Sequence, residues 1–248
     1  MYRQVANASH RNGLAEPQYG SVAVAQSGQI GALVALERIG MRLSFSRNDE
    51  IYAEGDSSDS WYKVVSGTVR VCKLLADGRR YIAEFCFSGD CFGIDSPNER
   101  PYSAEAVDDV IVMRYRRNAA ERLIDENPAL ARLLRDTMVR DLTNAHGHML
   151  LLGRMTASER VAAFLLEMFE RRDRTKALDL PMSRNDIADY LGLTIETVSR
   201  VFSHLHDAGV LDFFGTTQRE IIIRDRLRLT SFDMPQRQHG VNRIEGSV

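Results

Sequence analysis

Three side chains near residue 200 have the types and the spacing that contact with DNA base edges requires. Glu196, Ser199 and Arg200 lie three and four residues apart, so a helix would place them on one face. Arginine can donate two hydrogen bonds to guanine, glutamate can accept one from cytosine, and serine can bond a base or a phosphate. The alternative for Glu196 and Arg200 is an ordinary surface ion pair, worth roughly 0.2–0.5 kcal/mol.

We interpret this face as a DNA-reading surface in the first turns of a recognition helix. The methyl group of Thr197 and the side chain of Ile195 suit contact with thymine, whereas Arg200 favours guanine. The face therefore predicts a half-site with a G·C pair beside A·T pairs. The expected DNA-contacting residues are Ile195, Glu196, Thr197, Ser199, Arg200 and Ser203.

The segment 183–208, which carries this face, has the pattern of a helix-turn-helix. Ser183 and Thr194 are good N-caps for two short helices, and Gly192 lies between them where the chain needs a positive φ. Two helices joined by a tight glycine turn are typical of DNA-binding proteins, with an ordinary αα-hairpin as the alternative. The residues that serve the caps, the close crossing, the turn and the buried stripe are Ser183, Ala188, Gly192, Leu193, Val198 and Val201.

Strand-like runs at 210–214 and 219–223 follow the motif and predict a hairpin wing. Charge alone does not indicate DNA binding, because the net charge is −2 and residues 154–230 hold twelve Lys and Arg against twelve Asp and Glu. We therefore expect that contacts with the bases, more than overall charge, decide which DNA sequences the protein binds. Candidates for phosphate contact are Thr216, Gln218 and Arg219. For Arg224, Arg226 and Arg228 the alternatives are phosphate contact and a solvated side chain.

Residues 128–152 predict one long helix, with Asn127 as its cap and Pro128 at its first position. From Met138 onward its apolar residues repeat with a period near 3.5, which is typical of a coiled-coil seam. We expect a parallel two-stranded coiled coil between two copies of the chain; burial against the chain's own domain is the alternative. The seam consists of Leu134, Met138, Leu142, Ala145, Met149 and Leu152.

Residues 41–116 show a different pattern, with short apolar or alternating runs separated by turn residues. The dipeptide Asp77-Gly78 between two such runs is a strong hairpin signal. Together these runs predict an antiparallel sandwich or barrel. The fold class is therefore α+β, with an antiparallel β-roll first, a long dimerisation helix next and a winged helix-turn-helix last.

Several classes of protein are disfavoured. No apolar run reaches the roughly 18–20 residues of a membrane span, and the N-terminus lacks a signal-peptide pattern, so we expect a cytoplasmic protein. Three cysteines, Cys72, Cys86 and Cys91, cannot form a four-thiolate iron–sulfur site within one chain. An enzyme with a metal in the β-roll is disfavoured because none of the six histidines falls in residues 41–116. A pure interaction module would leave the Glu196–Arg200 face without a role.

The order of a β-roll, a long helix and a winged helix-turn-helix resembles the CRP/FNR superfamily of bacterial transcription regulators, over roughly residues 30–230. The run 196–200, Glu-Thr-Val-Ser-Arg, matches the E-x-x-S-R signature of its FNR and FixK branches, and the FixK type is the most similar. This resemblance implies a homodimer that binds double-stranded DNA at a TTGA…TCAA palindrome. It also implies activation through RNA polymerase of genes for oxygen-limited respiration and nitrogen fixation.

The same resemblance implies that two cofactors of the superfamily are absent. The N-terminal cysteines that hold an iron–sulfur cluster in FNR are missing, since residues 1–71 contain no cysteine. The Gly-Glu and Arg-Ser pairs that bind cyclic AMP in CRP correspond to Gly93-Ile94 and Tyr102-Ser103 here. We therefore expect no cofactor, and the alternative is a regulator gated by an unidentified small molecule in the β-roll.

The resemblance also organises the chain into segments. We expect a flexible arm at 1–28, a β-roll sensor domain at 29–126 and a dimerisation helix at 127–153. A winged helix-turn-helix domain then occupies 154–230, and a flexible tail occupies 231–248.

Overall fold

The structure is a computed structural model that describes residues 31, 33–94, 98–171, 177–215 and 219–231. The predicted arm at 1–28 and almost all of the predicted tail at 231–248 lie outside these residues. Residues 33–39 are helical and precede the first strand. No helix in the described ranges has the length and apolar character that crossing a bilayer demands.

The N-terminal half is a β-roll made of two four-stranded sheets, in the orders β1-β8-β3-β6 and β2-β7-β4-β5. Every strand pair in them is antiparallel, as predicted. The Asp77-Gly78 hairpin is confirmed: it joins β4 to β5, and Gly78 has a φ of 84°. The strands are β1 Met41–Phe45, β2 Glu50–Tyr52, β3 Ser60–Ser66, β4 Val69–Leu74, β5 Arg80–Cys86, β6 Cys91–Phe92, β7 Ser103–Ala106 and β8 Val110–Arg116.

Alternation along the strands fills the roll with small and branched side chains. Val64, Val69, Cys86 and Val112 are at most 1% exposed and belong to one apolar cluster. Tyr52, Tyr62 and Phe92 stack at one side of that cluster. The roll therefore has a core of its own, as a period-2 pattern predicts.

Two helices follow the roll: α2 Arg117–Glu126 and α3 Pro128–Arg154. The cap prediction for α3 is confirmed, because the Asn127 side chain accepts hydrogen bonds from the backbone N–H groups of Ala129 and Leu130. The sequence reading missed α2. Its first turn has no side-chain cap and no acidic residue, so the usual start signals are absent.

The described residues of the C-terminal part form four helices and a small sheet of order β10-β11-β9. The predicted wing is present as the β10–β11 pair, and β9 extends it as an unpredicted third strand. A three-residue strand that pairs about 40 residues away carries little local signal. The elements are α4 Ala157–Arg171, β9 Ala177–Asp179, α5 Arg184–Leu191, α6 Ile195–Asp207, β10 Leu211–Phe214, β11 Glu220–Ile223 and α7 Arg226–Thr230.

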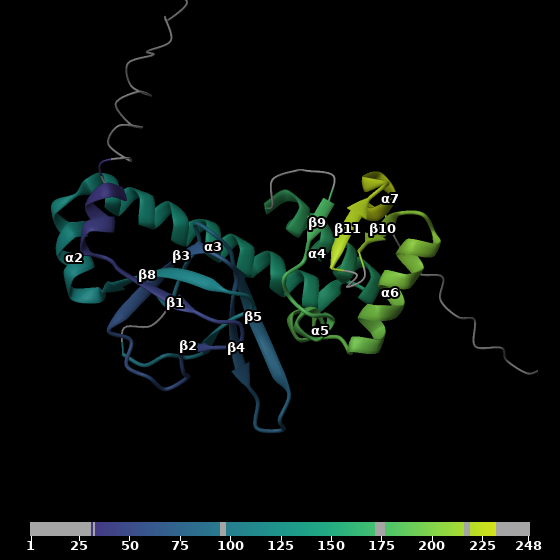
Figure 1. The fold of residues 1–248 in the computed structure, drawn as a ribbon, viewed down its shortest axis with the longest axis horizontal. Helices are drawn as coiled ribbons and strands as arrows, with labels where there is room; N and C mark the ends of the chain where they lie inside the picture. The colour runs from purple at the N-terminus through teal and green to yellow at the C-terminus, as the bar shows by residue number, and fades with distance from the viewer. Residues whose placement is uncertain (1–30, 32, 95–97, 172–176, 216–218, 232–248) are drawn as a thin grey trace, which may run out of the picture.

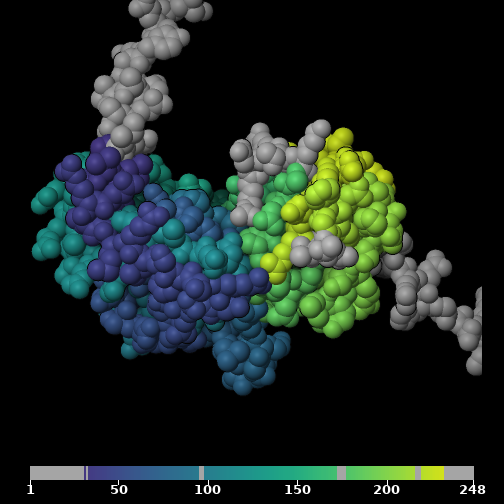
Figure 2. All heavy atoms as spheres, in the orientation of Figure 1, coloured from purple at the N-terminus to yellow at the C-terminus, as the bar shows by residue number. Residues whose placement is uncertain are grey.

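The long helix α3 passes along the β-roll and reaches the C-terminal lobe, as Figure 1 shows. The two lobes also meet directly (Figure 2). Ile82 and Phe85 of β5 share one buried cluster with Phe164 of α4 and Tyr190 of α5. The ring centroids of Phe85 and Tyr190 are 5.3 Å apart. The β-roll and the C-terminal lobe thus share a continuous apolar core.

Candidate nucleic-acid interface

The first helix of the motif, α5, begins at a complete capping box. The Ser183 hydroxyl accepts a hydrogen bond from the backbone N–H of Asp186, and the Asp186 carboxylate accepts one from the backbone N–H of Ser183. The helix ends at Gly192, whose φ of 62° and ψ of 39° are left-handed. Leu193 then donates its backbone N–H to the Ala188 carbonyl at 3.0 Å. This geometry matches the predicted cap and turn.

The second helix, α6, buries one stripe and exposes the opposite face. Val198, Val201, Phe202 and Leu205 are at most 2% exposed and pack into the C-terminal core. Thr194 caps α6 by accepting the backbone N–H of Thr197 at 3.3 Å. The stripe holds the helix against α4 and α5 and leaves its first turns at the surface.

The predicted reading residues fall into two groups in the structure. Ile195, Glu196, Ser199, Arg200 and Ser203 are all exposed. Thr197 is half-buried, and its hydroxyl lies 3.1 Å from the Thr194 hydroxyl within the cap. The five exposed residues are therefore better placed for DNA than Thr197, which has a structural role as well.

The charged pair on this face is not locked into a side-chain ion pair in the described part of the chain. Arg200 donates its Nε–H to the Glu196 backbone carbonyl at 3.3 Å. A backbone hydrogen bond and the Thr194 hydroxyl lower the pKa of Glu196, and the charge of Arg200 adds to this effect. The exposed carboxylate is thus held ionised as an acceptor. The guanidinium keeps further N–H donors beyond the one it uses here.

Two arginines that were not among the predicted site residues hold the helix-turn-helix in place. The Arg160 guanidinium donates to the carbonyls of Leu152, Met155 and Leu191 at 2.7–3.0 Å, so it joins the end of α3 to the end of α5. Arg184 lies with its Cζ 3.4 Å from the centroid of the Phe202 ring, and burial lowers its pKa to about 10. Nothing in the local sequence pattern marks either residue, since their partners lie on other elements.

The arginines after the wing have partners within the chain. Arg224 pairs with Asp212 at 2.8 Å, Arg226 pairs with Glu170, and Arg228 donates to the Ala208 carbonyl at 2.9 Å. These contacts favour a structural role for the three side chains. Of the other phosphate candidates, Thr216 and Gln218 lie outside the described residues.

The predicted seam on α3 narrows in the structure. Met138, Leu142 and Met149 are 48–60% exposed, and Ala145 is exposed beside them. Leu134, by contrast, is buried within its own chain against Trp61, Tyr115 and Leu130. Leu152 is half-buried against the C-terminal core. Leu134 and Leu152 pack within their own chain because α2, the β-roll and the C-terminal lobe cover that side of α3. Exposed Val139 and Leu150 add to the apolar surface that Met138, Leu142 and Met149 form.

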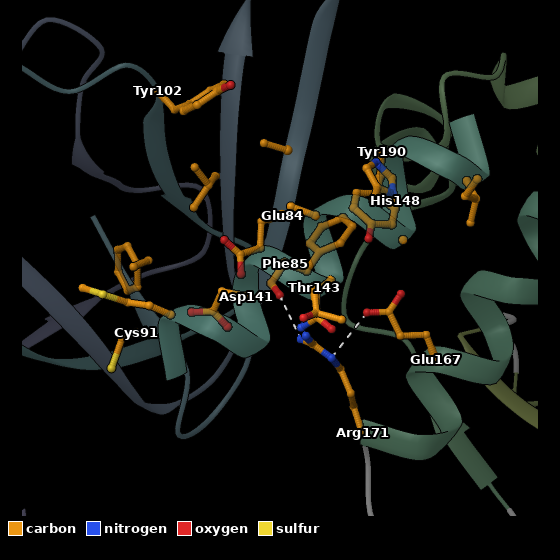
Figure 3. A pocket seen from close by; sticks show the side chains of 18 of the residues that line it. Glu84, Phe85, Cys91, Tyr102, Asp141, Thr143, His148, Glu167, Arg171 and Tyr190 are labelled. Atoms are coloured by element: carbon orange, nitrogen blue, oxygen red, sulfur yellow. Dashed lines mark hydrogen bonds and ion pairs between the residues drawn. The ribbon is translucent and has the colours of Figure 1, made fainter. Parts of the chain in front are cut away.

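A cavity of about 860 Å³ lies where the β-roll, α3, α4 and α5 meet. Figure 3 shows Arg171 extending from α4 towards Phe85 and Glu167 at its wall. Burial raises the pKa of Glu167 and also that of Asp141, against the opposing charges of nearby arginines. Aromatic and charged residues that line it include Tyr52, Glu84, Phe85, Phe92, Tyr102, Asp141, His148, Glu167, Arg171 and Tyr190.

The part of the β-roll beside Gly93 is occupied by an arginine. Arg100 is 3% exposed and donates from Nη1 to the Gly93 carbonyl at 2.6 Å and from Nη2 to the Ser60 carbonyl. Its Cζ lies 4.2 Å from the centroid of the Tyr52 ring. Ser103 accepts the backbone N–H of Glu54, so its hydroxyl is also in use. Arg100 is thus hydrogen-bonded to the backbone at Gly93, and Gly93, Ile94 and Tyr102 also line the cavity described above.

The described residues also offer no evident metal centre. They contain no group of three or more His, Cys, Asp or Glu side chains arranged to hold a metal ion. Burial raises the pKa of the Cys72 and Cys91 thiols to about 11, and it raises that of Cys86 as well. The three thiols are therefore protonated near neutral pH, the form that binds metals poorly.

Comparison with known proteins agrees with this architecture. Residues 42–127 match the family described as the cyclic nucleotide-binding domain, and residues 159–232 match the Crp-like helix-turn-helix domain. The chain is 41% identical over 217 residues to the nitrogen fixation regulation protein FixK of Azorhizobium caulinodans, covering 86% of each protein. It is 42% identical over 193 residues to FixK of Bradyrhizobium diazoefficiens, covering 76% of this chain and 81% of that protein.

A solved structure of FixK2 from Bradyrhizobium japonicum is also similar. It aligns with a TM-score of 0.74 at 45% identity, covering 79% of this chain and 98% of that chain. The fold and the helix-turn-helix define a DNA-binding transcription regulator of the CRP/FNR superfamily. Within that superfamily the chain belongs to the FixK-type activators. These relatives are transcription regulators and not enzymes.

Proposed function

We propose that this activator works as a homodimer that binds a TTGA…TCAA palindrome and recruits RNA polymerase. The genes that it serves are those of oxygen-limited respiration and nitrogen fixation, and the names of its FixK relatives refer to the regulation of nitrogen fixation. The observation that carries the proposal is the exposed face of α6, where Glu196, Ser199 and Arg200 lie together above a buried stripe. The guanidinium of Arg200 suits the guanine of TTGA, and the Glu196 carboxylate suits the opposite cytosine.

The exposed apolar face of α3 supports the dimer. Met138 and Leu142 lie one turn apart and Met149 lies two turns further along, and each exposes about half of its surface or more. A monomer would leave this stripe in water, whereas a second copy of α3 would cover it. Two parallel helices would then present two α6 faces to half-sites about one turn of DNA apart.

Independence from cofactors is the second part of the proposal. The buried Arg100 guanidinium beside Gly93 already donates to the carbonyls of Gly93 and Ser60, and Ile94 stands where the resemblance would place a glutamate. The three cysteines are two buried thiols and one half-buried thiol, all on β-strands. We therefore propose that the protein binds DNA without cyclic AMP and without an iron–sulfur cluster.

A DNA-binding titration tests both parts. The full chain, purified in air, is added to a labelled duplex carrying the palindrome and to a duplex with both guanines replaced. We expect tight binding to the first duplex, weaker binding by about 1–3 kcal/mol for each replaced pair, and no change with cyclic AMP. Equal affinity for the two duplexes would overturn the palindrome. A requirement for cyclic AMP or for anaerobic reconstitution with iron and sulfide would overturn cofactor independence.

A second candidate function rests on the 860 Å³ cavity between the lobes. A volume of that size suits a small molecule, and its walls come from both the β-roll and the DNA-binding lobe. A ligand there would change how the lobes meet, so the protein would be a regulator gated by an unidentified effector.

This second candidate is tested by removing any small molecule that co-purifies. Protein is unfolded in guanidinium, dialysed exhaustively, refolded and compared with untreated protein on the same palindrome. Equal affinity favours the cofactor-free activator. Loss of affinity that returns with the boiled small-molecule fraction of the cell extract favours the gated regulator.

A further inference from the structure

The first helix of the DNA-binding motif is tied to the β-roll by a cluster of charged side chains. Arg80 of β5 donates its Nε–H to the Asp189 carboxylate at 2.8 Å and also pairs with Asp186. Arg70 of β4 reaches the same Asp186 oxygen at 3.4 Å. We name these four residues, Arg70, Arg80, Asp186 and Asp189, the interlobe clamp. Its two halves come from regions of the chain more than 100 residues apart.

The clamp is well shielded from water. The side chains of Arg70 and Asp186 are 9% and 6% exposed, and those of Arg80 and Asp189 are 25% and 19% exposed. Arg70 is held on its other side by Glu105 at 2.6 Å. Burial acts to raise the pKa of Asp186, but the Ser183 hydrogen bonds and the two arginines outweigh it and lower that pKa. The Asp186 carboxylate is therefore held in its ionised form between the two arginines.

The clamp also acts on the α5 N-terminus itself. Asp186 closes the capping box with Ser183, so the same carboxylate fixes the start of α5 and its attachment to the β-roll. A buried ion pair adds little net stability, because the cost of removing two charges from water offsets their attraction. It does define how α5 is oriented relative to the β-roll, because two guanidinium groups must meet two carboxylates in one geometry.

We propose that Arg70 and Arg80 are positioning residues for DNA binding: the interlobe clamp sets the orientation of the helix-turn-helix relative to α3, and thereby the half-site spacing that the dimer accepts. This inference rests on the proposed function, because it needs two copies on a palindrome. The clamp holds α5 and leaves the exposed residues of α6 uncovered. It therefore orients the reading face without blocking it.

The test measures preference for half-site spacing in the full chain. Fluorescence anisotropy gives the affinity for duplexes that carry both half-sites with the preferred gap and with one base pair added or removed. One base pair turns a half-site by about a tenth of a helical turn, so a rigid dimer should discriminate. We expect the unsubstituted protein to prefer one gap by roughly tenfold. Arg80→Gln and Asp189→Asn should each lower that preference to about twofold.

Three further variants separate positioning from general damage. Arg79→Gln is the matched control, because neighbouring Arg79 pairs with exposed Asp77 in the hairpin turn and not with the clamp in the described residues. It should keep the full spacing preference. Arg80→Lys retains the charge and should restore part of the preference. If Arg80 and Asp189 act as a pair, the double variant Arg80→Gln with Asp189→Asn should lose no more of the spacing preference than either single variant.

The outcomes distinguish this inference from the function on which it rests. A spacing preference in the unsubstituted protein that survives in both Arg80→Gln and Asp189→Asn overturns the positioning role and leaves the palindrome intact. No spacing preference in the unsubstituted protein overturns both. Affinity for a single half-site and the thermal midpoint should stay unchanged in Asp189→Asn; a fall in both would make the clamp structural and would also overturn the inference.

Discussion

At the scale of single residues, Arg200 offers the sharpest test of base recognition. Arg200→Ala should weaken binding to the palindrome by about 1–3 kcal/mol, because it removes a bidentate contact to guanine. It should also relax the choice of base at that position. Competition titrations with all four bases at the guanine position measure both effects.

A second arginine of the same lobe provides the control for Arg200. Arg224 pairs with Asp212 beside the wing and lies off the reading face. Arg224→Ala should leave base preference unchanged, even if affinity falls uniformly through a lost phosphate contact. If Arg200→Ala gives the same uniform loss as Arg224→Ala, the guanine assignment is wrong.

The sequence predicts local features of the site and misses those that depend on distant partners. The caps at Ser183 and Thr194, the turn at Gly192 and the exposed face of α6 follow from spacings of three and four residues, which a helix imposes. Arg160 and the interlobe clamp could not be predicted in this way. Their partners come from elements far along the chain, and an isolated arginine in a sequence looks like a solvated side chain.

At the scale of elements, two glycines in helical regions should respond oppositely to alanine. Gly192→Ala should lower the free energy of unfolding by about 1–2 kcal/mol, because an alanine disfavours the left-handed φ of 62°. Space is not the cause, since an added Cβ would lie 3.6 Å from its nearest neighbours. Gly147 lies within α3 with nothing near its Cβ position, so Gly147→Ala should add about 0.5–1 kcal/mol.

Chemical denaturation of the two glycine variants at one protein concentration gives the comparison. Equal protein concentration matters because association of two chains would itself shift the midpoint. Destabilisation by both substitutions would mean that Gly147 has a packing role on α3. Tolerance of both would mean that the turn after α5 can relax.

The exposed stripe on α3 gives the second prediction at this scale. Leu142→Glu should shift the protein towards monomer, because it places a charge in the middle of the apolar face. Sedimentation equilibrium measures the mass directly. Leu227, on α7 and 85% exposed, is the matched control, and Leu227→Glu should leave the mass unchanged. A dimer mass for Leu142→Glu would contradict the seam.

Elements were predicted well where their pattern is long and poorly where it is short. The 27 residues of α3 and the alternating strands of the β-roll carry a clear period. The short strand β9 and the uncapped helix α2 do not. The seam was predicted from its period alone, and period cannot tell which of its residues the chain itself will bury. That is why Leu134 and Leu152 proved to pack within the chain.

At the scale of the whole molecule, the two lobes form one structural unit. Phe85 belongs to the β-roll but packs against Phe164 and Tyr190 of the C-terminal lobe. The interlobe clamp and the pair of Arg171 with Asp90, at 3.3 Å, add charged contacts around this apolar centre. The position of α6 is therefore fixed by the β-roll as well as by its own lobe. A change in this shared apolar core should therefore affect both DNA binding and stability.

A contact between α3 and the C-terminal lobe also predicts how the stability of the protein depends on pH. His148 of α3 stacks on Tyr190 of α5 with the ring centroids 4.2 Å apart, and its Nε2 has no hydrogen-bond partner in the described structure. Burial lowers the pKa of His148 below its ordinary value near 6.5, against a hydrogen bond with the Tyr190 backbone that raises it. The folded protein therefore keeps this imidazole neutral at a pH where the unfolded chain already binds a proton.

That difference fixes the sign of the effect. Because the folded pKa lies below the unfolded one, stability from His148 is complete above about pH 6.5 and declines as the pH falls below it. The decline cannot exceed one proton, or about 1.4 kcal/mol per pH unit. His148→Gln removes the titrating group, so the stability of the unsubstituted protein relative to this variant should fall between pH 7.5 and 5.

Exposed His146 on the same helix is the control, and His146→Gln should follow the unsubstituted protein throughout. Denaturation curves for the three proteins at matched concentration decide the question; parallel stability profiles for His148→Gln and the unsubstituted protein would show that the imidazole is solvated when folded.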